Sequence, residues 1–430
     1  MGHIVNPQRE YRLLRRQLDR TVAGAPDSPI LMQILSILFS PEDARVARRL
    51  PGRLARLEEL SRRLDIPEPE LLDRLGAMAE RGLVVDLEHE GHRWFALPPV
   101  VIGLFEFAFM RTRDEVPQAE LARLFEEYSS RDSRFAQSLF QGQTQVARTL
   151  VREDALPEDD HTEILDWERA GELIRSATAA GVSLCACRHK ASHLGTACDA
   201  PQRVCLSLNF AAESLVRNGM AEPLTTAEAV KILEGCQEAG LAQSGDNVQH
   251  RVSFICNCCG CCCEIMRAMK RFDLRGAIVT SNWIMEVDLS KCTGCGKCVA
   301  ACPVDAIELG QNPTGKAVRD EKLCLGCGVC YSACQAGAIS MKPRRRRVFT
   351  PENVFDRVAL MAIERGKLAG LIFDDPKRFS HRALGRLIAL LERANVLKAA
   401  MAIRPLRSVF LRRVITEGKK QLGPIAEILD

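Results

Sequence analysis

The placement of the cysteines constrains this sequence more than any other feature. The chain has 430 residues and 19 cysteines, and every cysteine lies between Cys185 and Cys334. Six of them fall within the eight-residue segment CNCCGCCC, from Cys256 to Cys263. A free cysteine packs like a small apolar residue, and its reactivity usually decides where it is retained. Packing does not explain such a run, so the central block of the chain is expected to carry the chemistry.

The rest of the composition is that of an ordinary globular protein of several domains. Apolar residues make up 47% and charged residues 27%, and 59 basic against 55 acidic residues give a net charge of +4. This balance does not require a nucleic-acid or membrane partner. The longest apolar run, Phe95 to Met110, contains prolines and a glutamate and is shorter than the roughly 20 residues of a membrane helix. No transmembrane span is predicted.

The expected compartment follows from the first residues and the thiols. The opening segment, MGHIVNPQREYRLLRRQ, lacks the apolar core of a secretory signal, so we expect a cytoplasmic protein. Thiols in a reducing cytosol do not form a disulfide framework, so the cysteines indicate bound metal.

The first part of the chain predicts a basic N-terminal helix or arm over residues 1–28 and a winged-helix-like domain over residues 29–103. Leucines at helical spacing predict helices around 57–64 and 71–78, and a hairpin is expected from Val84 to Leu97. Amphipathic patterns then predict a helical support over residues 104–180.

Winged helices often bind DNA, but the second predicted helix is too acidic for that role. It carries Glu68, Glu70, Asp73 and Glu80 against Arg74 and Arg81. A helix in a DNA groove faces phosphates, so this excess of acid is unfavourable. Nucleic-acid binding is not expected, and a packing or partner-docking role is favoured.

Two later stretches, CTGCGKCVAACP and CLGCGVCYSACQ, repeat a C-x2-C-x2-C-x3-C spacing. Such short loops let one turn of backbone present two thiolates to one cluster, and the glycines permit the tight path. The alternative, a zinc ribbon made of C-x2-C pairs, is disfavoured by two tandem runs of four cysteines.

The repeat resembles the bacterial two-cluster ferredoxins, and residues 286–343 are assigned to a dicluster ferredoxin domain. In those proteins the fourth cysteine of each run binds the other cluster. The resemblance implies two 4Fe-4S clusters, the first bound by Cys292, Cys295, Cys298 and Cys334 and the second by Cys324, Cys327, Cys330 and Cys302. Gln335 stands where proline is usual, which affects the rigidity of the turn more than the ligation.

Residues 181–285 form the expected cysteine-rich metal domain. Its candidate ligands are Cys185, Cys187, Cys198 and Cys205, then Cys256, Cys258, Cys259, Cys261, Cys262 and Cys263. Crowded thiolates repel one another, and a soft metal removes that cost. Adjacent cysteines cannot all face one cubane. The domain therefore holds either two further iron-sulfur clusters shared between the stretches or one non-cubane cluster with more than four thiolates. Structural zinc and a bare redox thiol site are the less favoured alternatives.

Basic and imidazole side chains accompany the first of these cysteines: Arg188, His189, Lys190 and His193. Cations there would stabilise an anionic cluster or bind an anionic substrate, and ordinary solvated side chains are the alternative. Cys236 stands alone in LEGCQEAG and is predicted to be a buried helix residue.

From Ile164 to Cys334 the chain resembles a family of dicluster ferredoxin-like proteins of anaerobic bacteria and archaea. In that family a helical lead such as ILDWERAGELI precedes C-x-C-R-H-K, GTACDAP and ICNCCGCCC, and the ferredoxin repeat follows. The resemblance implies an iron-sulfur electron-transfer protein or an oxidoreductase subunit, and it implies no substrate.

The whole sequence therefore predicts an α+β multidomain protein whose ferredoxin module relays low-potential electrons to or from the cysteine-rich site. Its expected partner is a redox protein or an oxidoreductase complex. A redox-sensing regulator that acts through the winged helix is the alternative, and an enzyme with substrate on an incompletely ligated iron is a third. No catalytic residue is predicted. Residues 344–430 are expected to be helical, and the arginine-rich part from Arg404 to Arg413 could contact a membrane surface or a partner, although a solvated face is favoured.

Overall fold

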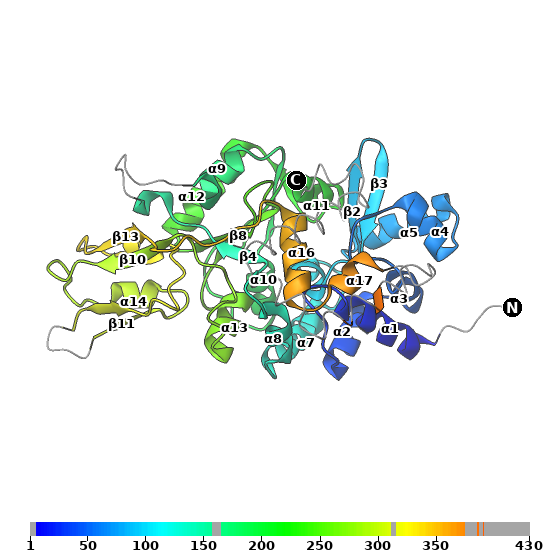
Figure 1. Ribbon diagram of the computed structural model, residues 1–430, viewed down its shortest axis with the longest axis horizontal. Coiled ribbons are helices and arrows are strands. Elements are labelled where there is room, and N and C mark those ends of the chain that lie inside the picture. The colour runs from blue at the N-terminus through cyan, green and yellow to red at the C-terminus, as the bar shows by residue number, and fades with distance from the viewer. Residues whose placement is uncertain (1–5, 157–164, 311–314, 375–384, 387–389, 391–430) are drawn as a thin grey trace. The chain divides into compact units, whose positions relative to one another are not determined.

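The computed structural model describes residues 6–156, 165–310 and 315–374, with residues 385, 386 and 390 (Figure 1). The chain divides into two compact units. The first, here called the N-terminal unit, comprises residues 1–144, 217–220 and 353–430. The second comprises residues 145–216 and 221–352, and it is called the cysteine unit because it holds all 19 cysteines.

The N-terminal unit is mostly helical. Its described helices are α1 (Pro7–Asp19), α2 (Pro29–Leu38), α3 (Pro41–Ala47), α4 (Leu57–Leu64), α5 (Glu68–Glu80), α6 (Phe105–Phe109), α7 (Gln118–Ser130), α8 (Arg134–Phe140), α16 (Val354–Glu364) and α17 (Leu368–Ile372), with a kinked turn at Val100–Leu104. A three-stranded sheet joins β1 (Ala55–Arg56), β3 (His92–Ala96) and β2 (Val85–His89) in that order. Leucines of α4 and α5 are buried, as their helical spacing predicts.

The two helices and the hairpin of this unit lie where the sequence predicts them. Asp65 adopts a left-handed conformation, with φ of 63°, and ends α4 before α5 begins. Strands β2 and β3 are joined by Glu90 and Gly91, both with positive φ, which is the geometry of a two-residue hairpin turn. The acidic residues of α5 are exposed: Glu68, Glu70, Asp73 and Glu80.

The segment that follows the cysteine unit packs in the N-terminal unit. The guanidinium of Arg365 donates hydrogen bonds to the carbonyls of Leu139 (2.9 Å) and Gln141 (3.1 Å). The carboxylate of Glu364 accepts hydrogen bonds from the backbone amides of Gln143 and Thr144. Helices α16 and α17 therefore belong with the start of the chain. The arginine-rich stretch from Arg404 to Arg413 lies outside the described residues.

The cysteine unit is built on a six-stranded sheet in the order β4-β8-β9-β6-β5-β7, with every neighbouring pair antiparallel. Its strands are β4 (Ala147–Thr149), β5 (Ala180–Leu184), β6 (Arg203–Leu208), β7 (Glu222–Leu224), β8 (Ala242–Asp246) and β9 (Phe254–Cys258). The sequence pattern predicts no sheet here. Strands β4 and β5 also lie within or at the end of residues 104–180, where only helices are expected.

Helices connect these strands. They are α9 (Ala170–Arg175), α10 (Ala186–His193), α11 (Asn209–Arg217), α12 (Thr226–Glu238) and α13 (Glu264–Phe272), with 3₁₀ turns at Glu153–Ala155 and Asp166–Glu168. Helix α12 packs against α9 and against strands β5 and β6.

The ferredoxin segment has two small sheets and two short helices (Figure 1). Strand β10 (Trp283–Val287) pairs with β13 (Ile339–Pro343), and β11 (Ile307–Leu309) pairs with β12 (Ala317–Arg319). Helices α14 (Lys297–Ala301) and α15 (Val329–Ala333) pack against each other. Within the part of the chain that the structure describes, no helix combines the length and the apolar character needed to cross a membrane.

Candidate metal centres

The ferredoxin cysteines gather into the two groups that the sequence predicts. The first group lines one cavity together with glycines of its own run: Cys292, Cys295, Cys298 and Cys334. In the second group, Cys302 lies close enough to Cys324, Cys327 and Cys330 to influence their pKa values. Each group thus takes its fourth thiol from the other run. Ligation by these thiols stays a prediction.

Local geometry is repeated between the two runs. The amide of Ala306 donates a hydrogen bond to Sγ of Cys302 (3.2 Å), and the amide of Ala338 donates one to Sγ of Cys334 (3.3 Å). Such N–H···S bonds stabilise a charged cluster and tune its potential. Gln335, at the position where proline is usual, accepts a hydrogen bond from Nζ of Lys297.

The two ferredoxin groups differ in exposure. Cys295 of the first group is exposed, whereas Cys324, Cys327 and Cys330 of the second are buried. Backbone hydrogen bonding around Lys297 lowers the pKa of Cys295, while burial raises the pKa of Cys327 to about 12. The first group therefore faces solvent and the second is enclosed.

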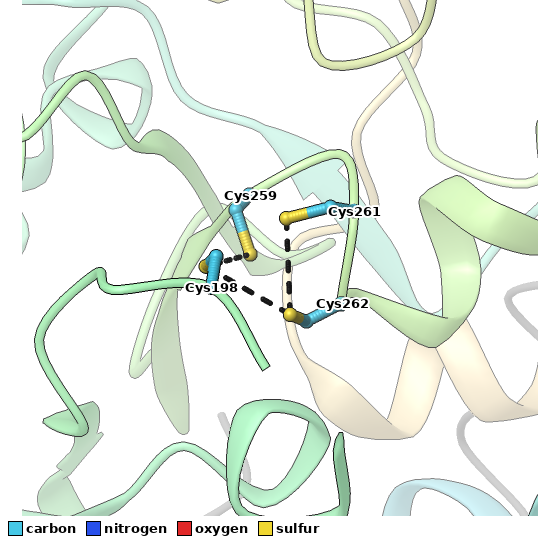
Figure 2. Close-up of side chains that lie close together, drawn as sticks. All are labelled: Cys198, Cys259, Cys261 and Cys262. Atoms are coloured by element: carbon cyan, nitrogen blue, oxygen red, sulfur yellow. Dashed lines mark hydrogen bonds between the residues drawn. The ribbon is translucent and has the colours of Figure 1, made fainter. Parts of the chain in front are cut away.

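Four upstream cysteines form a tight group, here called the four-thiol site (Figure 2). Sγ of Cys198 lies 3.6 Å from Sγ of Cys259 and 3.8 Å from that of Cys262, and Sγ of Cys261 lies 3.8 Å from that of Cys262. All four sulfur atoms lie within 4.8 Å of one another. Cys198 comes from the loop after α10, and the other three come from the turn after β9.

The remaining six upstream cysteines form a second group, here called the six-thiol site: Cys185, Cys187, Cys205, Cys256, Cys258 and Cys263. Three of them lie on neighbouring strands. Cys256 and Cys258 are two residues apart on β9 and so share one face of the sheet. Leu206 pairs with Ile255, a register that sets Cys205 of β6 opposite Cys256.

The other three thiols of the six-thiol site lie at the starts of two helices. Cys185 is the N-cap of α10, Cys187 lies in its first turn, and Cys263 is the N-cap of α13. A helix N-terminus favours negative charge, because its first amides have no partner within the helix. The site therefore combines one face of the sheet with two helix N-termini.

Hydrogen bonds join the six thiols into a chain that runs from Cys205 to Cys256, Cys258, Cys263, Cys187 and Cys185. These bonds and burial raise the pKa of Cys185, Cys256 and Cys258 well above the ordinary value. The metal-free thiols are therefore protonated at neutral pH, and a bound metal must displace their protons. Soft iron or zinc suits such a ligand set.

Arg188 serves both upstream sites. Its side chain is fully buried and interacts electrostatically with Cys185, Cys198 and Cys259. One guanidinium nitrogen donates to the carbonyl of Asn257 (2.8 Å), and Nε, also buried, has no hydrogen-bond partner among the described residues. A hydrogen bond from Cys262, together with Arg188, lowers the pKa of Cys259 to about 3. The cation thus favours thiolate next to it.

The other basic and imidazole candidates make different contacts. Nζ of Lys190, which is fully buried, forms an ion pair with Glu264 (2.6 Å) and so ties α10 to α13 beside the six-thiol site. The rings of His189 and His193 stack with centroids 4.8 Å apart on α10. Glu264 was not predicted from the sequence; its place directly after the cysteine run is the only signal.

Cys236 is buried on α12, as predicted, and belongs to neither upstream site. It packs with Val204 and Leu241, and burial raises its pKa to about 12. A neutral thiol of this kind behaves as a small apolar side chain.

The turn that carries the four-thiol site packs directly on the ferredoxin segment. A Cβ atom at Gly260 would meet the carbonyl oxygen of Pro303 at 2.1 Å and its Cα at 2.8 Å. Only glycine permits so close an approach of two backbones. Pro303 directly follows Cys302, and Gly260 lies between Cys258 and Cys263 of the six-thiol site. This contact was not predicted, and its only signal in the sequence is the single glycine in the cysteine run.

Comparison with known proteins defines the class of the ferredoxin segment. Residues 291–338 match the family described as a 4Fe-4S dicluster domain. All eight cysteines of the repeat fall in this range, so the predicted ferredoxin-like iron-sulfur domain is confirmed there.

A relative in the same range is a component of the ion-translocating oxidoreductase complex of Methanosarcina acetivorans. It is 56% identical to this chain over 34 residues, which are 8% of this chain and 13% of that protein. The chain thus spans only a small part of that relative. No solved structure matches the chain. These findings support a role in iron-sulfur electron transfer.

Proposed function

We propose that this protein transfers electrons between a redox partner and an iron-sulfur cluster in the six-thiol site, with the dicluster ferredoxin domain as the relay. In this proposal Cys292, Cys295, Cys298 and Cys334 bind the first ferredoxin cluster, and Cys324, Cys327, Cys330 and Cys302 bind the second. Residues 181–285 form the metal domain that exchanges electrons with the relay domain, residues 286–343.

The contact between Gly260 and Pro303 carries the proposal. The rate of electron transfer falls steeply with the distance between two cofactors. At this contact the backbone next to Cys302, a ligand of the second ferredoxin cluster, touches the backbone next to the six-thiol site. Cys258 and Cys263 flank the same turn, so the path from one centre to the other crosses only a few residues.

The exposures of the two ferredoxin groups support a direction for the relay. Cys295 is exposed, and the cysteines of the second group are largely buried. An external donor or acceptor therefore meets the first cluster, and the second cluster links it to the six-thiol site. Iron-sulfur potentials depend on hydrogen bonds and solvent exposure, so the sign of the net flow follows from the partner.

A redox protein or a member of an oxidoreductase complex fits as the partner, and the similarity to a component of such a complex supports this choice. We place the protein in the cytoplasm, where reduced thiols can acquire iron and sulfide. We interpret α4, α5 and the β2–β3 hairpin as a winged-helix module that docks protein partners. Its use by a DNA-binding redox regulator is disfavoured by the exposed acidic face of α5.

The proposal is tested by removing the relay clusters. The double variant Cys295→Ala/Cys327→Ala removes one ligand from each ferredoxin cluster and none from the six-thiol site. In anaerobic protein whose circular dichroism matches the wild type, the signal of the six-thiol cluster should persist but be reduced far more slowly by an external low-potential donor. Cys236→Ala is the matched control and should leave the rate unchanged. Reduction of the upstream cluster at the wild-type rate in the double variant would refute the relay.

A further inference from the structure

The sulfur atoms of the four-thiol site are too close together for a cubane cluster. Three sulfur–sulfur distances are 3.6, 3.8 and 3.8 Å, and all four atoms lie within 4.8 Å of one another (Figure 2). In a 4Fe-4S cluster each thiolate binds a different iron at an outer corner of the cube. The inorganic core then separates the thiolates, which cannot touch one another.

A single tetrahedral ion fits these distances. Zinc–sulfur bonds measure about 2.3 Å, and a tetrahedron with bonds of that length has sulfur–sulfur edges of about 3.8 Å. The three distances lie at this value, and the adjacent residues Cys261 and Cys262 supply one edge. Neighbouring cysteines that cannot both face a cube can therefore share one ion.

The other cysteine groups of this chain are arranged differently. Among the residues that the structure describes, the four-thiol site is the one group with three or more ligand atoms within 4.8 Å of one another. The first ferredoxin group surrounds a cavity. The six thiols of the other upstream site touch only in succession, as a chain. The same molecule thus contains wide cages for clusters and one closely packed tetrahedron.

We propose that Cys198, Cys259, Cys261 and Cys262 bind one Zn²⁺ ion as a structural tetrathiolate site. This inference goes beyond the proposed relay and does not depend on it. Zn²⁺ binds such a ligand set more tightly than Fe²⁺ does, and closed four-cysteine sites are typical of structural zinc. Four thiolates around Zn²⁺ carry a net charge of −2, and the fully buried Arg188 lies beside Cys198 and Cys259 to offset it.

The ion would have a definite structural role. Cys198 lies in the loop that follows α10, and the other three ligands lie in the turn that contacts Pro303. Zinc would fasten that loop to the turn and hold Gly260 against the ferredoxin segment. Because Zn²⁺ has no redox chemistry, the ion would position the electron path without carrying electrons.

The first test measures the metals in wild-type holoprotein purified without oxygen or added metal. Elemental analysis should find one zinc per chain beside the iron. X-ray absorption at the zinc edge should find four sulfur ligands at about 2.3 Å and no neighbouring metal atom. Less than half a zinc per chain, nitrogen or oxygen ligands, or a single iron in the zinc position would each overturn the proposal.

The second test assigns the ion to its ligands. Cys198→Ala should remove the zinc and leave the iron content and the iron-sulfur spectra unchanged, whereas the control Cys236→Ala should retain both metals. Loss of iron with retention of zinc in Cys198→Ala would overturn the assignment. If Cys198→Ala does not fold, Cys261→Ala at the exposed ligand provides the same comparison, and the wild-type absorption spectrum decides independently.

Discussion

The ferredoxin segment and the cysteine-rich region that precedes it use the same residue in opposite ways. In the ferredoxin segment, each cluster site draws its thiols from two short runs within residues 292–334, and tight glycine turns place them. In the cysteine-rich region, each site draws on residues some sixty or more positions apart, such as Cys198 and Cys259. A sheet and two helix N-termini bring those residues together.

The difference shows what spacing alone can specify. A local repeat defines its own cage, so its chemistry follows from the sequence. The run CNCCGCCC supplies residues to two different sites, because Cys256 and Cys258 face one side of β9 while Cys259, Cys261 and Cys262 lie in the turn that follows. Cys263 then returns to the first site as the N-cap of α13. Neighbours in the sequence thus serve different metals.

The largest expected effect is the loss of the upstream iron on removal of one central thiol. Cys258→Ala breaks the chain of six thiols at its middle, so the cluster in the six-thiol site should not assemble. Anaerobic protein should retain about eight iron atoms, those of the two ferredoxin clusters. Iron analysis and electron paramagnetic resonance check this outcome. Loss of the ferredoxin signals as well, in folded protein, would show that the two regions form one interdependent site.

A smaller but substantial effect is expected at Arg188. Arg188→Met removes a buried cation beside thiolates, which should destabilise the holoprotein by about 3 kcal/mol or more. It should also make the potential of the upstream cluster more negative, because reduction adds charge that the cation no longer offsets. Anaerobic denaturation and redox titration measure the two effects. Arg188→Lys keeps the charge and should keep most of the potential; an unchanged potential in Arg188→Met would argue against a cluster near this residue.

A moderate effect is expected where the two regions touch. Gly260→Ala places a methyl group on the carbonyl of Pro303, and the forced shift should cost about 1–3 kcal/mol. It should also slow electron transfer between the ferredoxin domain and the upstream cluster. The control Gly235→Ala, in the exposed interior of α12 with nothing near its Cβ position, should stabilise the protein by about 0.5–1 kcal/mol. Equal transfer rates in both variants would remove the contact from the electron path.

The smallest effect concerns the two ferredoxin clusters themselves. Cys295 is exposed and Cys327 is buried, so oxygen should reach the first cluster sooner. During brief exposure to air, the signal of the first cluster should decay before that of the second, followed by Mössbauer or paramagnetic resonance spectroscopy. Decay of both signals at one rate would remove the difference in accessibility on which the direction of the relay rests.

The sequence predicted the parts of the molecule that depend on local pattern. The eight ferredoxin cysteines, their grouping, the helices α4 and α5 and the burial of Cys236 all follow from spacing and periodicity. The six-stranded sheet was not predicted, because its strands are short and β8, with the sequence AQSGD, is fully buried although it is mostly polar. The division of ten upstream cysteines into sites of four and six depends on that sheet, and so does the contact of Gly260 with Pro303. Neither leaves a periodic pattern in the sequence.

The central claim, that the ferredoxin domain relays electrons to the six-thiol site, is tested most directly by the order of reduction. Oxidised wild-type holoprotein is mixed with less than one equivalent of a low-potential donor and frozen at successive times for paramagnetic resonance. The relay predicts that the ferredoxin signals appear first and then decay as the upstream signal grows. An upstream signal that appears before the ferredoxin signals, or that grows while they remain constant, would contradict it.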